Sequence, residues 1–444
     1  MSSTLQEFAG RAAAALESAD PVLHRLLLGE LDRQMHSLTM VASCSVTHPS
    51  VLACEGLFTS NVTAEGYPGA RFHAGCKYID QFEQLAIDRA KSVFKAQYAN
   101  VQPHTASTAN QIVTSAVLKP GDTLLGMSLT SGGHLSHGAK VNISGKFYNA
   151  VGYGLNSQVF IDFEQVEKLA ELHRPKLIIC GATAYPRTID WQKFRDIADR
   201  VGAFLLADIT HIAGLVIAGL HPSPIDVAHF TVTCTHKQLY GPRGGLILMG
   251  REWDAPSPTG KGTLSSLIQS GVFPFTQGAP IINKIVAKAR TLDRAGSGEF
   301  KALMCRILTL SRALADSLMK DGMEVVSGGT DNHIVLVNVR NSLGISGIIA
   351  EKALEECNII VNKNFIPGDQ SKVSVTSGIR IGTNALAARC FGTSEMAVCA
   401  ALIGNVLRAV KPLGDYEYEL SAQIRHDVQE EVRLLGARFP IPGY

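Results

Sequence analysis

The sequence predicts an α/β fold built on a mainly parallel sheet, and two kinds of segment carry this prediction. Short apolar runs at 176–180 and 204–208 are typical of strands that are buried on both faces. Between about residues 60 and 285, such runs alternate with segments that have helical spacing, which is the pattern of βαβ units. A chain of 444 residues is long enough to form two domains with a sizeable core.

Three parts are expected along the chain: an N-terminal helical arm (1–55), a large domain (56–285) and a smaller C-terminal α/β domain (286–444). Apolar residues recur at spacings of three and four in the arm and after the large domain, which predicts helices there. The expected elements are helices at 5–16, 22–35, 282–295 and 300–321, and a strand at 333–338.

Composition narrows the class of protein. A hydrophobic content of 46% is normal for a soluble enzyme, and a formal charge of +2 gives no support for a nucleic-acid partner. No run approaches the roughly 18 apolar residues of a membrane helix, and the first residues lack the features of a secretory signal. Nine scattered cysteines without a Cys-x-x-Cys pair indicate reduced thiols and no metal site. We therefore expect a cytoplasmic protein without a membrane partner.

Lys237 is the candidate nucleophile. It lies in Thr-His-Lys-Gln-Leu-Tyr-Gly-Pro-Arg-Gly-Gly, residues 235–245, between hydrogen-bonding residues and a glycine-rich turn. A lysine in a partly desolvated pocket loses part of its preference for the charged form, so it can attack a carbonyl and hold a cofactor as a Schiff base. The cofactor implied is pyridoxal 5'-phosphate (PLP). Considered alone, a lysine beside a turn is usually a solvated surface residue. The motifs in the rest of the chain favour a lysine that binds the cofactor.

The predicted strand at 204–208 ends in a carboxylate, Asp208, and His211 follows three residues later. Open α/β sheets bind ligands at the carboxyl ends of their strands, where Asp208 would keep the pyridine nitrogen of the cofactor protonated. The alternative is an N-cap for a helix that begins at Ile209. His211 would approach the cofactor from the same turn.

Motifs along most of the chain resemble those of the serine hydroxymethyltransferase family, beginning with the cofactor-lysine segment at 235–245. The other similar segments follow the family's order: Glu-Gly-Tyr-Pro-Gly (65–69), Asn-Val-Gln-Pro-His (100–104), Gly-Gly-His-Leu-Ser-His-Gly (132–138), Asp-Ile-Thr-His-Ile-Ala-Gly-Leu (208–215), Ser-Gly-Gly-Thr-Asp-Asn-His (327–333) and Ser-Gly-Ile-Arg-Ile-Gly-Thr (377–383). The resemblance implies the fold type I architecture of PLP-dependent transferases.

The matching motifs also imply residue roles. The cofactor would be held by Lys237, Asp208, His134, Thr183, His211, Ser107, Ala106 and His236, with His134 stacking on the ring and Ser107 binding the phosphate at a helix N-terminus. For His134 the alternative is a capping histidine in a glycine-rich loop. Arg380 and Ser43 would contact the substrate carboxylate, and Glu65 would act as acid and base near the substrate hydroxyl.

The resemblance further implies a homodimer or a homotetramer with shared active sites. Thr63, Gln277 and Gly278 are the residues expected from the neighbouring chain.

Departures from the family pattern surround the expected site. Residues 43–46 read Ser-Cys-Ser-Val where the family has Ser-Glu-Asn-Phe, and 72–75 read Phe-His-Ala-Gly in place of Tyr-Tyr-Gly-Gly. His73 could replace the second tyrosine as an acid/base group, the alternative being polar packing. The family's Pro-Asn-Asp-Pro loop is Pro-Gly-Asp-Gln at 367–370, and loss of an amide partner weakens binding by roughly 1 to 3 kcal/mol per unpaired buried group. Use of tetrahydrofolate is therefore doubtful at this stage.

These departures favour a folate-independent threonine-type aldolase or transaldolase, which joins a glycyl unit to an aldehyde through a carbanion that the cofactor ring stabilises. Its partners would be a small amino acid and an aldehyde. One alternative is a tetrahydrofolate-dependent hydroxymethyltransferase acting on serine or α-methylserine. Another is a non-catalytic binding homologue, against which the retained catalytic set argues: Lys237, Asp208, His134, Glu65 and Arg380.

Overall fold

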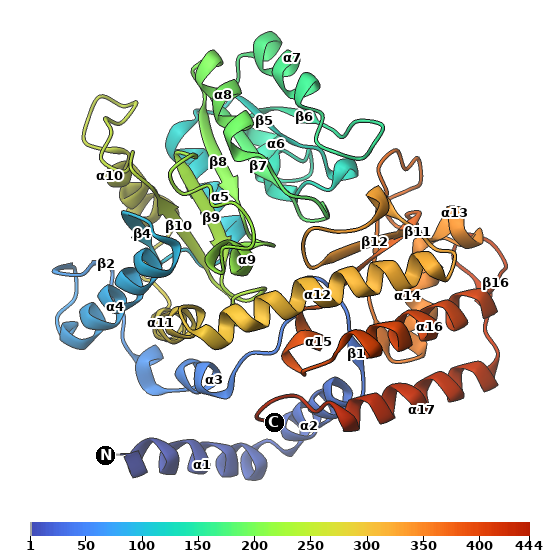
Figure 1. Cartoon of the computed structure of the whole chain (residues 1–444). Coiled ribbons are helices and arrows are strands. Elements are labelled where there is room, and N and C mark those ends of the chain that lie inside the picture. Colours follow the sequence, from blue (N-terminus) through green and yellow to red (C-terminus); the bar gives the residue numbers. More distant parts are fainter. Residues whose placement is uncertain (1) are drawn as a thin grey trace.

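A seven-stranded sheet forms the centre of the molecule in the computed structural model, which describes residues 2–444 (Figure 1). Its strand order is β4 (Tyr98–Asn100), β10 (Gly245–Met249), β9 (Phe230–Cys234), β8 (Phe204–Asp208), β7 (Leu177–Gly181), β5 (Thr123–Met127) and β6 (Asn149–Tyr153). β10 is antiparallel to both of its neighbours, and the strands from β9 to β6 are parallel. The predicted α/β fold with a mainly parallel sheet is confirmed.

Alternate residues of these strands enter two hydrophobic cores, one on each face of the sheet. Leu206 of β8 packs with α5 (Ala106–Val117) and α10 (Leu264–Ser270), whereas Leu205 faces the larger core. That larger core includes α4 (Lys77–Phe94), α7 (Phe163–His173), α8 (Trp191–Val201), α9 (Ala213–Ile217) and α11 (Ile282–Ala295). Because both faces are covered, the strands read as continuous apolar runs.

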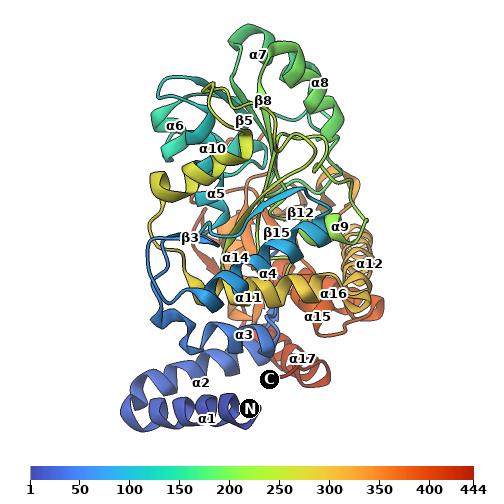
Figure 2. The ribbon, with the colours of Figure 1, turned by 90° about the vertical axis from the view of Figure 1, so that its left-hand side faces the viewer.

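A smaller antiparallel sheet lies beyond the long helix α12 (Gly298–Lys320) (Figures 1 and 2). Its strand order is β11 (Glu324–Val325), β12 (Ile334–Asn338), β15 (Gly378–Gly382) and β14 (Asn362–Asn364). Helix α14 (Gly347–Glu356) packs on β14 and β15, α16 (Thr393–Ala409) packs on α12 and α14, and α17 (Ala422–Arg438) follows. Domain boundaries at residues 55 and 285 stay a proposal.

The N-terminal arm contains α1 (Ser2–Ala19) and α2 (Pro21–Met35), which pack against each other at the bottom of the molecule (Figure 1). Asp20 caps α2 by accepting a hydrogen bond from the backbone N–H of Leu23. After α2, β1 (Leu38–Thr39) pairs with β13 (Ile359–Ile360), and α3 (Pro49–Glu55) leads towards the large domain. Both helices leave apolar side chains in solvent: Leu5, Phe8, Val22, Leu23, Leu26, Leu27 and Leu28. Among residues 2–444, no helix is long and apolar enough to cross a membrane.

Candidate active site

A cavity of about 390 Å³ opens at the carboxyl ends of the parallel strands, and we call it the crevice pocket. Its walls come from the segments that follow β5, β7, β8 and β9, together with the N-terminus of α5 and residues of the arm and of β15. Ligands bind at this edge in open α/β sheets because successive loops converge there. Its lining residues include Ser43, Cys44, Thr105, Ala106, Ser107, Asn110, His134, Thr183, Asp208, Thr210, His211, His236, Lys237, Arg243 and Arg380.

Lys237 reaches the pocket from a rigid loop after β9. The backbone of Thr235 closes this loop by accepting a hydrogen bond from the N–H of Gly241 at 2.8 Å and donating one to the carbonyl of Gly244 at 3.1 Å. The amine Nζ of Lys237 lies 2.7 Å from Nε2 of His211. Burial lowers the pKa of Lys237 below 10.5, which favours the neutral amine that a nucleophile requires.

His211 is itself buried, and its ring stacks on that of His333 with centroids 5.6 Å apart. His333 Nε2 lies 3.1 Å from the backbone carbonyl of Ala42, which fixes the second ring. Burial lowers the pKa of His211 well below 6.5, so His211 is a neutral partner that can accept a hydrogen bond from Lys237.

Asp208 ends β8 and is almost fully buried. Its Oδ2 accepts a hydrogen bond from the amide of Asn110 at 2.8 Å and lies 2.9 Å from Nε2 of His137, while its Oδ1 accepts one from the N–H of Thr210 at 3.0 Å. Burial raises the pKa of Asp208, but the hydrogen bonds that its carboxylate accepts from His137 and Thr210 outweigh burial, so the pKa falls well below 3.8. Asp208 is therefore a carboxylate that is held in place from three sides.

The backbone next to Asp208 is unusually close. Gly181 ends the neighbouring strand with φ of +142°, and a Cβ at this position would lie 2.3 Å from the carbonyl oxygen of Asp208. Only glycine fits there. Thr183 lies two residues after the end of β7, and its carbonyl accepts a hydrogen bond from Arg380.

His134 is a capping residue, which is the alternative that the sequence left open, and its stacking on a cofactor ring stays a prediction. It caps a short 3-10 turn, since its Nδ1 accepts a hydrogen bond from the N–H of Ser136 at 3.2 Å, and it also lines the crevice pocket. Burial and the nearby His137 lower the pKa of His134 to about 4. A neutral imidazole is therefore presented to the pocket. His236 lines the same cavity, and burial together with the charge of Arg243 lowers its pKa to about 4.

Arg380 comes from β15, so the smaller sheet also contributes to the pocket. Its Nη1 donates to the carbonyl of Thr183 at 2.7 Å, and its Nε donates to the side chain of Asn362 at 3.1 Å. Burial lowers the pKa of Arg380 to about 10, which still leaves the guanidinium charged near neutral pH. Ser43 and Cys44 of the arm lie on the same wall.

The donor set fits PLP. α5 begins at Ala106 with Thr105 as its N-cap, and its first N–H groups face the pocket as an anion site. Asp208 supplies the negative charge that a protonated ring nitrogen needs, and Lys237 supplies the amine. Four buried polar atoms of residues that line the pocket have no hydrogen-bond partner within the described chain: Asn110 Oδ1, Thr210 Oγ1, His211 Nδ1 and His236 Nδ1.

Five of the expected site residues lie outside this pocket. One is Gln277, whose side-chain oxygen accepts a hydrogen bond from the N–H of His104 at 3.0 Å. Thr63, Glu65, His73 and Gly278 gather instead beside the hairpin of β2 (Gly66–Tyr67) and β3 (Ala70–Arg71), and we call them the hairpin cluster. The N–H of Glu65 donates to Nδ1 of His73 at 3.4 Å, and a Cβ added to Gly278 would lie 3.6 Å from Glu65 Oε1. The structure therefore does not bring the expected acid/base residues to Lys237 within one chain. Figure 1 shows β2 beside α4, at the edge of the molecule.

Sequence reasoning assigned no role to His137, Asn110 or His333, although all three surround Lys237 or Asp208. A signal existed for the first two residues. His137 follows His134 in the same quoted motif, and its Nδ1 accepts the N–H of His134 at 3.4 Å, which leaves its Nε2 proton facing Asp208. Asn110 lies one helical turn after Ala106, on the face of α5 that lines the pocket.

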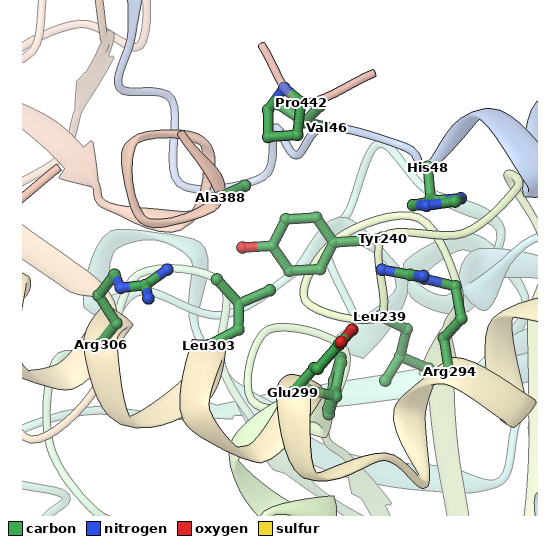
Figure 3. A pocket seen from close by; sticks show the side chains of 11 residues that line it. Val46, His48, Leu239, Tyr240, Arg294, Glu299, Leu303, Arg306, Ala388 and Pro442 are labelled. Atoms are coloured by element: carbon green, nitrogen blue, oxygen red, sulfur yellow. The ribbon is translucent and has the colours of Figure 1, made fainter. Parts of the chain in front are cut away.

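A second, smaller cavity of about 170 Å³ lies behind the lysine loop. Figure 3 shows Tyr240 in its centre, with Arg294 and Arg306 reaching in from α11 and α12. The Tyr240 hydroxyl donates to the carbonyl of Asn384 at 2.7 Å, so the ring braces the loop against the smaller domain. None of the expected site residues lines this cavity.

The family model described as serine hydroxymethyltransferase matches residues 16–403. The chain belongs to the serine hydroxymethyltransferase family. It is also 46% identical over 432 residues to a curated protein of Rhodospirillum rubrum named "Serine hydroxymethyltransferase 2", and the match covers 97% of each chain. Membership confirms the expected family, the fold type I architecture and a PLP-dependent enzyme.

The same similarity corrects the expected reaction. A folate-independent threonine-type aldolase or transaldolase is the wrong interpretation, because similarity along 97% of both chains favours hydroxymethyl transfer. The doubt about tetrahydrofolate is likewise unsupported. Both expectations rested on exchanges in a few loops, such as 72–75 and 367–370, and side chains in such loops can change while the core of the site is kept.

Proposed function

We propose that this chain is a PLP-dependent hydroxymethyltransferase that transfers a one-carbon unit between serine and tetrahydrofolate. The observation that carries the proposal is the convergence of Lys237, Asp208 and Arg380 on one pocket in a chain of this family. The named relative supports serine as the donor. α-Methylserine is the alternative donor, and a comparison of turnover rates distinguishes the two donors.

PLP, when bound, supplies an electron sink for the bonds at the α-carbon of the amino acid. Lys237 would hold the cofactor through its amine, and the carboxylate of Asp208 would keep the ring nitrogen protonated. His134 would lie against the ring, and the N-terminus of α5, with Ala106 and Ser107, would bind the phosphate.

Arg380 orients the amino acid by a bidentate contact with its carboxylate. Its guanidinium is already fixed by Thr183 and Asn362, so little side-chain entropy is lost when the substrate binds. His211 would accept or return a proton at Nζ of Lys237 across the 2.7 Å contact.

We propose that the hairpin cluster completes the pocket of a second copy of the chain. Glu65 is half-buried and His73 is exposed, and neither of these acid/base groups lines the pocket of its own chain. The apolar side chains that α1 and α2 leave in solvent support a homo-oligomer.

A mixing experiment tests this sharing. Lys237→Ala and Glu65→Gln homo-oligomers should each be inactive, because each lacks one essential group. Random subunit exchange should restore about a quarter of wild-type activity, since half of the dimers are mixed and each mixed dimer contains one intact site. If each site is built from one chain, mixing restores nothing.

Donor and acceptor are tested by following amino-acid product formation. L-serine, α-methylserine and L-threonine are each supplied with and without tetrahydrofolate, and glycine or alanine release is measured. Serine turnover that requires tetrahydrofolate supports the proposal, and faster folate-dependent turnover of α-methylserine would change the donor alone. Threonine cleavage that exceeds both and ignores folate would overturn it.

A further inference from the structure

Lys288 is a second buried lysine, and the reaction described above does not use it. It lies on α11 and is 2% exposed, which is rare for a lysine. Its Nζ donates three hydrogen bonds, to the carbonyls of Val101 at 2.6 Å, Pro103 at 3.0 Å and Gly245 at 3.0 Å. An ammonium group has three N–H donors, so the group is fully satisfied.

The three acceptors belong to two segments that both lead into the crevice pocket. Val101 and Pro103 lie between β4 and Thr105, the N-cap of α5, whereas Gly245 begins β10 directly after the Lys237 loop. The two segments also meet directly, since the N–H of Gly245 donates to the carbonyl of Pro103 at 2.9 Å. Lys288 therefore ties the expected phosphate end of the pocket to its lysine loop.

Two glycines leave room for this arrangement. A Cβ at Gly244 would lie 2.2 Å from Cε of Lys288, and a Cβ at Gly245 would lie 2.3 Å from the carbonyl oxygen of Thr105. Contacts below 3 Å are not tolerated in packed interiors. The lysine stem, the lysine loop and the start of α5 are therefore packed as one unit.

We propose that Lys288 is a positioning residue that fixes the N-terminus of α5 relative to Lys237, and so sets the affinity of the pocket for the cofactor's phosphate group. This inference rests on the proposed function, in which that helix end binds the phosphate. Lys288 touches neither cofactor nor substrate, because its three donors are used by backbone carbonyls.

The position offers a matched control on the same helix. Lys284 lies one turn earlier on α11 and is partly exposed, and it forms an ion pair with Glu55 of α3. Lys284 and Glu83 of α4 are the charged groups whose fields reach Lys288, and the field of Lys288 acts in turn on His104. Lys288→Met and Lys284→Met make the same chemical change, in one case at a lysine that binds three backbone carbonyls and in the other at a lysine that forms a partly exposed ion pair.

The test compares two cofactor forms on the full chain at pH 6.5. Dissociation constants for PLP and for pyridoxal, which lacks the phosphate, are measured for the wild type and both variants. We expect Lys288→Met to weaken PLP binding by at least about tenfold while pyridoxal binding changes much less. Lys284→Met should leave both constants, and hence their ratio, at wild-type values.

Three results separate the possibilities. A folded Lys288→Met variant with the wild-type ratio of the two constants overturns the inference and leaves the proposed function intact. A wild type that binds neither PLP nor inorganic phosphate overturns the proposed function itself. If Lys288→Met does not fold, Lys288→Gln, whose amide keeps two N–H donors, is measured in its place, and an unchanged ratio there counts against the inference.

Discussion

Lys237 and Lys288 are both buried lysines, one on the loop after β9 and the other on α11 where it contacts the end of that loop. Their surroundings give them different chemistry. Burial lowers the pKa of both. Nζ of Lys237 has one side-chain contact, to His211, and faces a cavity, whereas Nζ of Lys288 donates to three carbonyls and is sealed from solvent. Burial alone therefore does not make a lysine a nucleophile; an unused bonding direction that points into a cavity does.

Removing the nucleophile should give the largest effect. Lys237→Ala should abolish the visible absorbance of the purified protein and lower activity by about 10³-fold or more, because no covalent attachment of the cofactor remains. Lys288→Met, saturated with PLP, should keep a visible absorbance that borohydride bleaches. Spectra of both variants at equal protein concentration check this. A coloured, borohydride-sensitive Lys237→Ala protein would place the attachment on another lysine and break the comparison.

Removing the charge opposite the ring nitrogen should have the next largest effect. Asp208→Asn keeps the shape of the side chain but loses the carboxylate that Asn110 and His137 hold in place, and we expect kcat to fall by about 10²- to 10⁴-fold. The control is Asp190→Asn, which alters the N-cap of α8, outside the pocket. A kcat for Asp208→Asn within a few-fold of wild type would show that Lys237 works without this charge.

Loss of the three hydrogen bonds of Lys288 should lower the stability of the fold more than loss of a surface lysine does. Lys288→Met removes the lysine donor from three buried carbonyls, of which only that of Pro103 keeps another known donor, the N–H of Gly245, and it should lower the free energy of unfolding by about 3 to 5 kcal/mol. Lys284→Met loses only a partly exposed ion pair, which is worth about 1 kcal/mol or less. Chemical denaturation of both variants in the cofactor-free state gives the difference directly. Equal losses of unfolding free energy in the two variants would show that the three hydrogen bonds of Lys288 add no special stability.

A methyl group added at Gly244 of the lysine loop should lower the free energy of unfolding by less, and the size of the loss should depend on Lys288. Gly244→Ala places a methyl group 2.2 Å from the unmoved Cε of Lys288, and we expect a loss of roughly 1 to 3 kcal/mol in the free energy of unfolding. In a Lys288→Ala background the stem is gone, so the same substitution should cost less, and the two changes should not add. Additive losses would mean that the contact is relieved by other movements.

The sequence predicted the parts of the site that follow buried strands. Asp208, Thr183 and Lys237 each come after an apolar run, and such runs reveal which strand ends meet at one edge of a sheet. It could not separate Lys288 from Lys284, because both lie on one amphipathic helix and only the tertiary contacts of α11, with the segment after β4 and the first residue of β10, decide which one is buried. Nor could it place Glu65 and His73 apart from Lys237, since motif order does not reveal distance in space.

A further expected effect is a pH dependence of stability that comes from Lys288. Burial lowers the pKa of Lys288 to about 7 in the folded chain, from 10.5. Between these values the folded chain holds a neutral amine and the unfolded chain an ammonium, so unfolding takes up a proton and stability rises with pH; below about pH 7 both states are protonated and the slope vanishes. The difference in unfolding free energy between wild type and Lys288→Met should therefore widen as the pH rises from about 7 towards 10. Lys237 is present in both proteins, so its contribution cancels. A difference that stays constant over this range would show that Lys288 keeps its proton, and with it all three donors, in the folded chain.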